Sequence, residues 1–322
     1  MINPSKKIMS ITYALAGLLT LLFILTITLF SPSGTANKKR QAIQVQLIHE
    51  ADISNIDIIT IQHGASAIIL NRSDNMWLLA NQNNVNDKIP ADVQRLKSFF
   101  LLLATKHKMV KAGNASSKDN SYGLDSQEAT VITLYKNGLA YQLLSFGDLN
   151  FSQTQRYFTS QELKSVFLAG QEFDGFLTGS VTAWADPYII SPQLLNDVFS
   201  MGEAQSLDFY DYKTKKSTLL NTSDQEQNES IQKLFDLRHG GFVADSENQA
   251  FESSQNKALA VKIQMGDKSQ IKLEICEHDT IENEYIVYTS FDSERLGKSF
   301  SYKTQISAWT YSKISEMMLN TK

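Results

Sequence analysis

The chain has 322 residues, of which 42% are hydrophobic and 20% charged, and it contains 5 prolines and a single cysteine, Cys276. This composition excludes a disordered, collagen-like or disulfide-stapled protein, and one cysteine excludes an intrachain disulfide and a cysteine-rich zinc site. The formal net charge is −4; because residues 1–40 carry five basic and no acidic side chains, residues 41–322 carry −9. Because residues 41–322 are this acidic, they would repel the phosphate backbone of a nucleic acid. We therefore expect no nucleic-acid partner.

The first predicted element is a transmembrane helix at residues 9–30, MSITYALAGLLTLLFILTITLF, which carry no charge. At 1.5 Å per residue this stretch reaches about 33 Å, enough to cross a bilayer core. It is longer than the apolar core of a cleaved signal peptide, although cleavage near SGTA (33–36) is the alternative. Basic residues flank it on both sides, but the short head and the large following domain favour a signal anchor. We therefore expect a single-pass protein of a bacterial inner membrane with its bulk outside the cytoplasm.

The next elements form a β-β-β-α pattern. Short apolar or alternating runs at 56–61, 65–70 and 75–80 predict an antiparallel meander. The segment KIPADVQRLKSFFLLLATKHKMV then predicts a helix, in which Pro90 suits the first turn. Its apolar residues recur at steps of three and four and so share one face: Val93, Leu96, Phe99, Phe100 and Leu103.

Looser versions of this pattern follow along the chain. Strands are predicted at 129–136, 139–147, 156–159, 164–169, 206–212, 215–220, 258–266, 269–277 and 284–291, and helices within 230–241 and at 306–319. The predicted fold class is therefore α+β, with repeated antiparallel β-meander plus helix modules behind one N-terminal transmembrane helix. The expected division is a short cytoplasmic head (1–8), the transmembrane helix (9–30), a linker (31–46), paired β/α modules (47–200) and C-terminal β/α modules (201–322).

The sequence contains no motif that carries catalytic chemistry. DSERLGKS (292–299) ends like a phosphate-binding loop, but Asp292 stands where such a loop requires glycine. Cys276, His278 and Asp279 could ligate a metal only if a second cluster completed the shell, so a strand end with polar tips is the preferred interpretation. No H-E-x-x-H or G-x-S-x-G motif occurs. We therefore expect a protein that is not an enzyme and that has no cofactor and no metal site.

Two groups of residues are candidate structural joints or interaction sites. SYGLDS (121–126) separates a polar tract from a predicted strand; Gly123 permits a positive φ, Tyr122 and Leu124 can pin the turn, and Asp125 can bind backbone amides. The second group consists of tryptophans at the predicted transitions from a sheet to a helix, together with an aspartate in the turn that follows one of them. They predict buried packing residues or, alternatively, a sugar-stacking platform. This group is Trp77, Trp184, Asp186 and Trp309.

Several stretches, in their order, resemble bacterial domain-of-unknown-function family 4340. They are DNMWLLA, PADVQRLKSFFLLL, SYGLD, FGDLNFSQTQRYF and TAWADPYII, over roughly residues 47–190, with a weaker likeness at YKTQISAWTYSKI. The resemblance implies one N-terminal span and an extracytoplasmic β/α region, encoded in some members beside ABC-type permeases, including auxiliary components of gliding-motility transport. The family prefers a basic residue after the second tryptophan, whereas Ala185 follows Trp184 here, which weakens a binding role for that turn. The family has no established catalytic residues to carry over.

These features predict a non-enzymatic, membrane-anchored accessory or scaffold protein of a bacterial envelope complex, related to ABC-type export or motility. Its partners would be the membrane and an ABC-type permease or another envelope protein, bound through an exposed sheet edge. One alternative is an ectodomain that binds or processes envelope glycans, which requires carboxylates near an exposed tryptophan. Another is a solute-binding ectodomain, which requires a pocket between modules. Burial of Tyr122 and Trp184 would favour joints over both alternatives.

Overall fold

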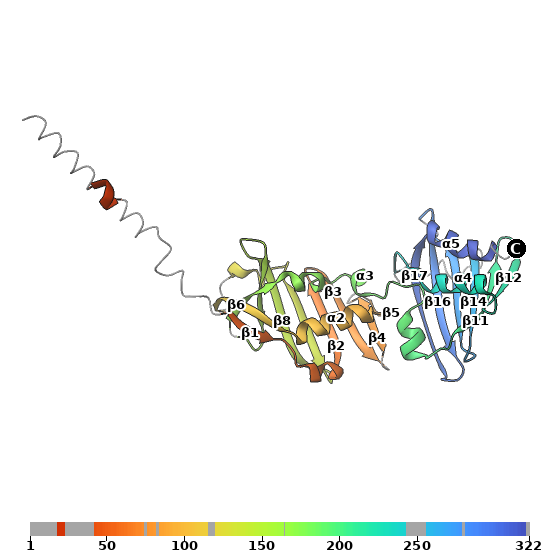
Figure 1. Cartoon of the computed structure of the whole chain (residues 1–322), viewed down its shortest axis with the longest axis horizontal. Helices are drawn as coiled ribbons and strands as arrows, with labels where there is room; N and C mark the ends of the chain where they lie inside the picture. The colour runs from red at the N-terminus through yellow and green to blue at the C-terminus, as the bar shows by residue number, and fades with distance from the viewer. Residues whose placement is uncertain are drawn as a thin grey trace, which may run out of the picture.

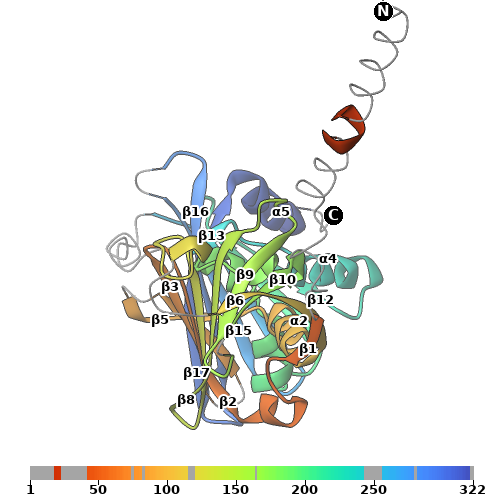
Figure 2. The ribbon, with the colours of Figure 1, turned by 90° about the vertical axis from the view of Figure 1, so that its left-hand side faces the viewer.

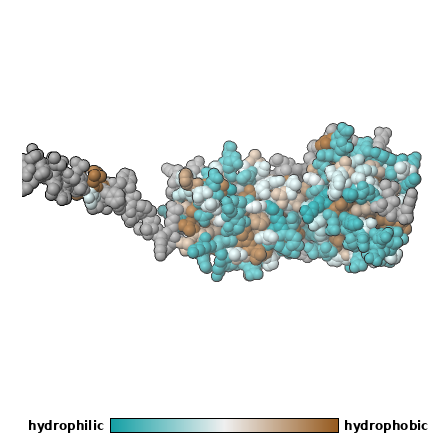
Figure 3. Space-filling view, turned by 45° about the horizontal axis from the view of Figure 1, so that its top comes forward, coloured by the Kyte–Doolittle hydropathy of each residue, from teal (hydrophilic) through white to brown (hydrophobic). Residues whose placement is uncertain are grey.

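Two antiparallel β-sheets form the body of the protein in the computed structural model (Figure 1). The structure describes residues 18–22, 42–73, 76–81, 84–114, 120–163, 165–242, 256–278 and 281–319. The sheets follow each other along the long axis of the molecule, so that one lies behind the other in the view along that axis (Figure 2). The face drawn in Figure 3 is mostly hydrophilic, with apolar residues in small separate groups.

The predicted transmembrane helix at 9–30 lies outside the described residues, except for residues 18–22, which are helical. Among the described residues, no helix combines the length and the apolar character that crossing a membrane requires. The transmembrane part of the predicted fold class is therefore not supported.

The first sheet contains ten strands, and every pairing between neighbours is antiparallel. In spatial order the strands are β1 (Ala42–Gln46), β6 (Lys106–Asn114), β10 (Ser165–Gly170), β9 (Gln155–Ser160), β8 (Leu139–Leu149), β7 (Thr130–Lys136), β2 (Ile56–His63), β3 (Ser66–Ser73), β4 (Met76–Asn81) and β5 (Asn84–Pro90).

Helix α2 (Val93–Ala104) covers the apolar face of this sheet, as the predicted apolar stripe requires. Alternate residues of β2, Ile59 and Ile61, are fully buried and pair with apolar residues of β3 on the same face. The helix buries Leu96, Phe99, Phe100 and Leu103 against them. It begins at Val93 rather than at Pro90, because the Asp92 carboxylate accepts a hydrogen bond from the Arg95 N–H at 3.0 Å and so caps the helix.

The second sheet contains seven strands, again all antiparallel. One face is buried: the cross-strand row Phe209, Val261, Leu273, Thr289 and Tyr302 is covered by helices and fully or nearly fully buried. The adjacent row on the other face is polar, as is usual for an antiparallel sheet with one solvated face. The strands in spatial order are β12 (Lys216–Asn221), β11 (Ala204–Asp211), β14 (Lys257–Met265), β15 (Gln270–Glu277), β16 (Glu284–Ser293), β17 (Lys298–Ser307) and β13 (Gly241–Phe242).

The remaining helices are short or lie on the second sheet. Helices α4 and α5 bury Ile231, Leu234 and Ile314 in the second core. The connection between the sheets contains the four-residue helix α3 and the π-helix η4. The bounds are η1 (Glu50–Asn55), η2 (Asn120–Tyr122), η3 (Gln171–Phe176), α3 (Val181–Trp184), η4 (Gln193–Val198), α4 (Gln225–Phe235) and α5 (Ala308–Leu319).

The prediction of an α+β fold made of repeated modules is wrong. Strand β2 pairs with β7, and β11 pairs with β14. The meanders that were expected as separate modules therefore join into two continuous sheets. The fold is mainly antiparallel β, with strands β1, β5, β6, β13 and β17 in addition to those predicted. The physical reason is that an edge strand leaves a row of backbone groups unpaired, and pairing two meanders satisfies them. Local periodicity predicts strands but does not say which edges meet.

The stretch SYGLDS belongs to residues 120–129, which we call the strap. The strap crosses the back of the first sheet, meaning the face opposite to helix α2. It leads from β6 to β7 across β10, β9 and β8, which lie between them. Phe158 and Phe167 point into the core, so the neighbouring Tyr157 and Leu168 point to the strap side. The Tyr122 ring packs against Tyr157 with ring centroids 4.9 Å apart. The strap therefore connects two strands of one sheet.

Strand β4 contributes to both cores. Trp77 and Leu79 belong to the apolar cluster of the first sheet, whereas Met76 and Leu78 belong to that of the second. Because successive side chains of a strand point to opposite faces, one strand can pack against both parts of the molecule. The second sheet and its helices thus rest on the back of β4.

Candidate functional site at the joint between the two sheets

The segment that links the two sheets begins at Trp184, which lies in the first core. Its side chain is fully buried, and its ring meets that of Phe99 edge to face at a centroid distance of 5.4 Å. The indole Nε1–H donates a hydrogen bond to the Thr178 carbonyl oxygen at 2.9 Å. The Arg95 guanidinium lies 4.7 Å from the centroid of the indole ring, a cation–π contact. Trp184 therefore fixes the start of the linking segment.

Backbone hydrogen bonds continue this attachment along the end of β5. The Asp92 N–H donates to the Trp184 carbonyl oxygen at 2.9 Å, and the Asp186 N–H donates to the Pro90 carbonyl oxygen, also at 2.9 Å. Between them Ala91 and Ala185 form an isolated antiparallel bridge. The linking segment is thus held like a short extra strand beside the first sheet.

Three residues after Asp186, the same segment is bonded to the second sheet. The Ile189 carbonyl oxygen accepts hydrogen bonds from the Tyr302 hydroxyl at 2.8 Å and from the Thr289 hydroxyl at 3.1 Å. The Tyr302 oxygen in turn accepts from the Ser191 N–H at 3.0 Å. Burial raises the pKa of Tyr302 above its ordinary value, so this phenol stays protonated and can donate.

Gln193 closes the joint from the π-helix η4. Its side-chain oxygen accepts from the Trp77 N–H at 3.1 Å, and its side-chain NH₂ donates to the Trp77 carbonyl oxygen at 3.2 Å. The amide thereby takes the place of a neighbouring strand at the beginning of β4. Gln193 is buried, so these bonds are protected from competition with water.

Asp186 places a buried carboxyl group at the centre of the joint. The residue as a whole is only 6% exposed. Its two oxygens accept hydrogen bonds from the Tyr188 N–H at 3.1 Å and the Ser191 hydroxyl at 2.6 Å. Burial raises the pKa of Asp186 to about 6; the hydrogen bonds from Ser191 and Tyr188 oppose the rise, and the charge of Asp92 adds to it.

His239 is bonded to the backbone of the same turn. A carbonyl oxygen can only accept, so the His239 Nε2, 2.7 Å from the Asp186 carbonyl oxygen, carries the proton. Burial lowers the pKa of His239, which keeps the ring neutral. Its Nδ1 is buried without a hydrogen-bond partner among the described residues.

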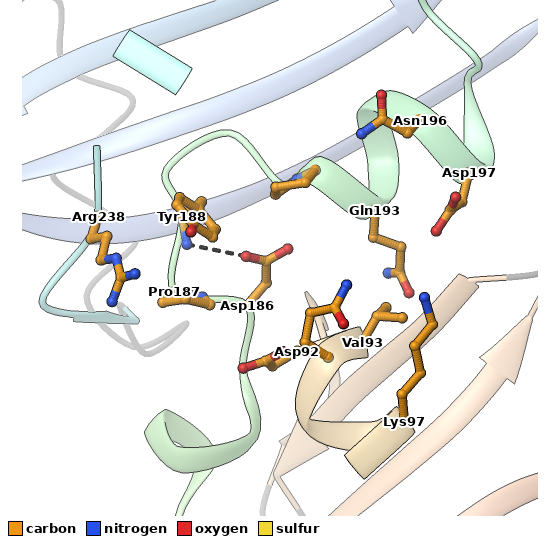
Figure 4. A pocket seen from close by; sticks show the side chains of 12 residues that line it. Asp92, Val93, Lys97, Asp186, Pro187, Tyr188, Gln193, Asn196, Asp197 and Arg238 are labelled. Atoms are coloured by element: carbon orange, nitrogen blue, oxygen red, sulfur yellow. Dashed lines mark hydrogen bonds between the residues drawn. The ribbon is translucent and has the colours of Figure 1, made fainter. Parts of the chain in front are cut away.

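A cavity of about 390 Å³ opens beside Asp186 and is lined by both sides of the joint. Figure 4 shows Asp186 and Asp92 near its middle, with Lys97 and Gln193 on one side and Arg238 on the other. The Arg238 guanidinium lies 5.3 Å from the centroid of the Tyr188 ring. The lining therefore combines acidic, basic and amide groups, which suit a small polar molecule better than an apolar one.

The structure brings some predicted site residues together and separates others. Trp77, Trp184 and Asp186 meet at the joint, Trp77 through its backbone. Trp309 lies 67% exposed on α5, with the Lys313 ammonium 5.8 Å from its ring centroid. The strap holds Tyr122, Gly123, Leu124 and Asp125 on the back of the first sheet.

Sequence reasoning missed Asp92, Arg95, Gln193, His239 and Tyr302. Of these only Asp92 had a usable signal, because an aspartate directly before an apolar helical stripe is a typical N-cap. For the potential metal ligands, the described residues contain no group of three His, Cys, Asp or Glu side chains placed to hold an ion. Cys276 is buried, and Asp279 lies outside the described residues.

Comparisons with known proteins add no relative. No protein-family model, no curated protein sequence and no solved structure matches the chain. The resemblance of the sequence motifs to the family of unknown function therefore stays a prediction.

Proposed function

We propose that this chain is a non-enzymatic accessory or scaffold protein of a bacterial envelope complex, at the inner membrane with its bulk outside the cytoplasm. The supporting observation is the joint, in which one segment is hydrogen-bonded to both sheets over the few residues from Trp184 to Gln193. Such a connection holds the two sheets at a fixed angle. A fixed angle is what a protein needs in order to present binding surfaces at a set separation.

The polar groups at the joint support this proposal, because they bond the protein's own backbone. The side chains of Tyr302, Thr289 and Gln193 all bind carbonyl oxygens or N–H groups of the connection or of β4. Buried polar groups that are satisfied in this way rigidify a fold rather than await a substrate. The partner we propose is an ABC-type permease or another envelope protein.

Edge strands are the surfaces that we propose for the partner. Strand β1 is one edge of the first sheet and β12 one edge of the second, and they lie toward opposite ends of the molecule (Figure 1). Both expose apolar side chains, Ile43 at 39% and Leu219 at 58%. An extended segment of a partner could add to either edge through backbone hydrogen bonds.

The test is photo-cross-linking in the native host, followed by mass spectrometry of the captured proteins. A photoreactive residue at Leu219 on β12 reports on the edge, and one at Lys272, on the polar face of the central strand β15, is the matched control. We expect Leu219 to capture a permease, its ATPase or another envelope protein, and Lys272 not to. Equal capture at Leu219 and Lys272, or no capture at Leu219, contradicts the proposal.

A solute-binding ectodomain is the second candidate, and the cavity beside Asp186 is the observation that favours it. Its acidic and basic lining suits a small zwitterion such as an amino acid, with Arg238 facing a carboxylate. Thermal unfolding in the presence of single amino acids tests this function. A rise in Tm that Arg238→Gln abolishes supports it, and no rise with any amino acid rejects it.

A further inference from the structure

A second hollow lies on the back of the first sheet, away from the joint, beside the strap. It has a volume of about 320 Å³ and lies between the strap and the turn that joins β8 to β9. We call it the aromatic hollow. Its lining includes Tyr122, Tyr157, Leu168, Asn150, Phe151 and Ser152.

Aromatic rings dominate this hollow. Tyr157 and Tyr122 form an edge-to-face pair, with Leu168 buried beside them. Phe151, at the tip of the β8–β9 turn, is fully exposed, with a relative exposure of 105%. A single exposed apolar residue is ordinary, but a fully exposed phenylalanine next to two tyrosines in a hollow is typical of a binding surface.

The polar side chains of the hollow are already oriented. Asn150 Oδ1 accepts hydrogen bonds from the Thr154 N–H at 3.1 Å and the Gln155 N–H at 3.3 Å, which build the turn. The Ser152 hydroxyl also donates to this oxygen, at 3.1 Å. Because the oxygen is used by the turn, the side-chain NH₂ of Asn150 is the donor that the turn leaves to a ligand.

No charged residue lines the aromatic hollow in the described part of the chain. A phosphate or a carboxylate would therefore enter without a counter-charge and lose its hydration. A sugar ring fits this chemistry, because its C–H faces are apolar and its hydroxyl groups accept and donate hydrogen bonds. The volume also suits one or two sugar rings, at the small end of known ligand sites.

We propose that the aromatic hollow binds a neutral saccharide, such as a hexose unit of an envelope glycan. The sugar ring stacks on Phe151 and Tyr157, and the NH₂ of Asn150 donates a hydrogen bond to a hydroxyl group. This proposal does not depend on the scaffold function. It also moves the glycan-binding surface away from the tryptophans, since Trp77 and Trp184 are buried and Trp309 is on helix α5, which packs on the second sheet.

The test is isothermal titration of the full chain with three neutral probes: chitotriose, cellotriose and maltotriose. We expect at least one to bind, and Phe151→Ala to weaken that binding by about tenfold, as the loss of one stacking ring and its apolar contact implies. Phe151 is fully exposed, so this variant keeps the fold. Trp309→Ala removes an exposed aromatic ring elsewhere and should leave binding unchanged.

Asn150→Asp separates ligand binding from turn structure. The aspartate keeps an oxygen for the turn but loses the NH₂, so we expect weaker saccharide binding with unchanged thermal unfolding. Failure of all three probes to bind at millimolar concentration overturns the proposal, and so does unchanged binding by Phe151→Ala. Phe151-dependent sedimentation with phosphatidylcholine vesicles, without saccharide binding, also overturns it, because the ring would then contact lipid.

Discussion

At the scale of single residues, Asp186 shows how position changes chemistry. Its carboxyl group accepts hydrogen bonds from two neutral donors, the Ser191 hydroxyl and the Tyr188 N–H, and is otherwise withdrawn from water. Its pKa of about 6 in the folded chain lies above the ordinary value of 3.8. The folded state therefore binds this proton more tightly than the unfolded state does.

The stability due to Asp186 is fully present below about pH 4 and is lost as the pH rises through about 6, for a total of about 3 kcal/mol. Asp186→Asn cannot ionise and imitates the protonated carboxyl. We expect the free energy of unfolding of the wild type, minus that of the variant, to fall by up to about 3 kcal/mol from about pH 4 to about pH 8.

Urea denaturation across this pH range measures the difference, and groups common to both proteins cancel in it. Asp197→Asn, on the exposed rim of the same cavity, is the control, and we expect it to change stability by less than about 0.5 kcal/mol. A pH-independent difference for Asp186→Asn would show that the carboxyl does not titrate in this range.

Three glycines let the strap approach the sheet. A Cβ at Gly147 would overlap the Tyr122 carbonyl oxygen, and one at Gly113 would overlap the Tyr122 hydroxyl. Gly123 combines a φ of +65° with close contact to the Asp148 carboxyl group. The role of SYGLDS is therefore steric: its backbone and Tyr122 lie close against strands at Gly113 and Gly147, where no side chain intervenes.

Gly147→Ala tests this packing. The new methyl group meets backbone atoms on the strap, which cannot rotate away, so we expect a loss of about 1–3 kcal/mol in the free energy of unfolding. Gly175→Ala, where the added Cβ meets nothing within 4 Å, should have almost no effect. Chemical denaturation of both variants gives the comparison, and equal effects would contradict the close approach.

At the scale of elements, the sequence predicted most strands and the faces of the helices. Helix α2 was recognisable from its apolar stripe, and its buried residues Leu96, Phe99, Phe100 and Leu103 are among those predicted. Strand β5 was missed, because NVNDKIP has no apolar alternation and is a strand through its pairing with β4. The π-helix η4 was missed as well, since only its place between the two sheets explains it.

Substitution of Gln193 tests the joint at the scale of elements, because this residue attaches η4 to the beginning of β4. Gln193→Ala leaves the buried N–H of Trp77 without its partner, and we expect a loss of about 1–3 kcal/mol. Asn196→Ala, exposed on the same short helix, should change stability by less than about 0.5 kcal/mol. Thermal and urea unfolding give both values. Similar losses would mean that the substitutions act through the helix and not through the two hydrogen bonds between Gln193 and Trp77.

At the scale of the whole molecule, β4 couples the two cores. Its side chains alternate between them, and the linking segment adds hydrogen bonds on both sides. Two sheets joined only by a loop would unfold independently. Here the shared strand predicts a single cooperative transition in calorimetry.

Leu78→Ala should uncouple the sheets. Leu78 lies in the second core although its strand belongs to the first sheet, so its truncation leaves a cavity between them and costs about 2–4 kcal/mol. We expect the calorimetric transition to broaden or divide in two. Leu219→Ala, 58% exposed on β12, is the control and should keep one transition. Two transitions already in the wild type would contradict the coupling.

The sequence by itself determined the acidic body, most strands, the amphipathic helices and the turn residues, because these follow from composition and from periods of two and 3.6 residues. It also predicted a joint at Trp184 and Asp186, although between repeated modules rather than between two sheets. Only the tertiary structure decided which strand edges pair, that the meanders join into two sheets, that Tyr302 and His239 meet the linking segment, and that Gln193 on that segment reaches β4. Those contacts join residues up to 116 positions apart, and no local pattern encodes them, since they depend on how the edges of whole sheets are satisfied.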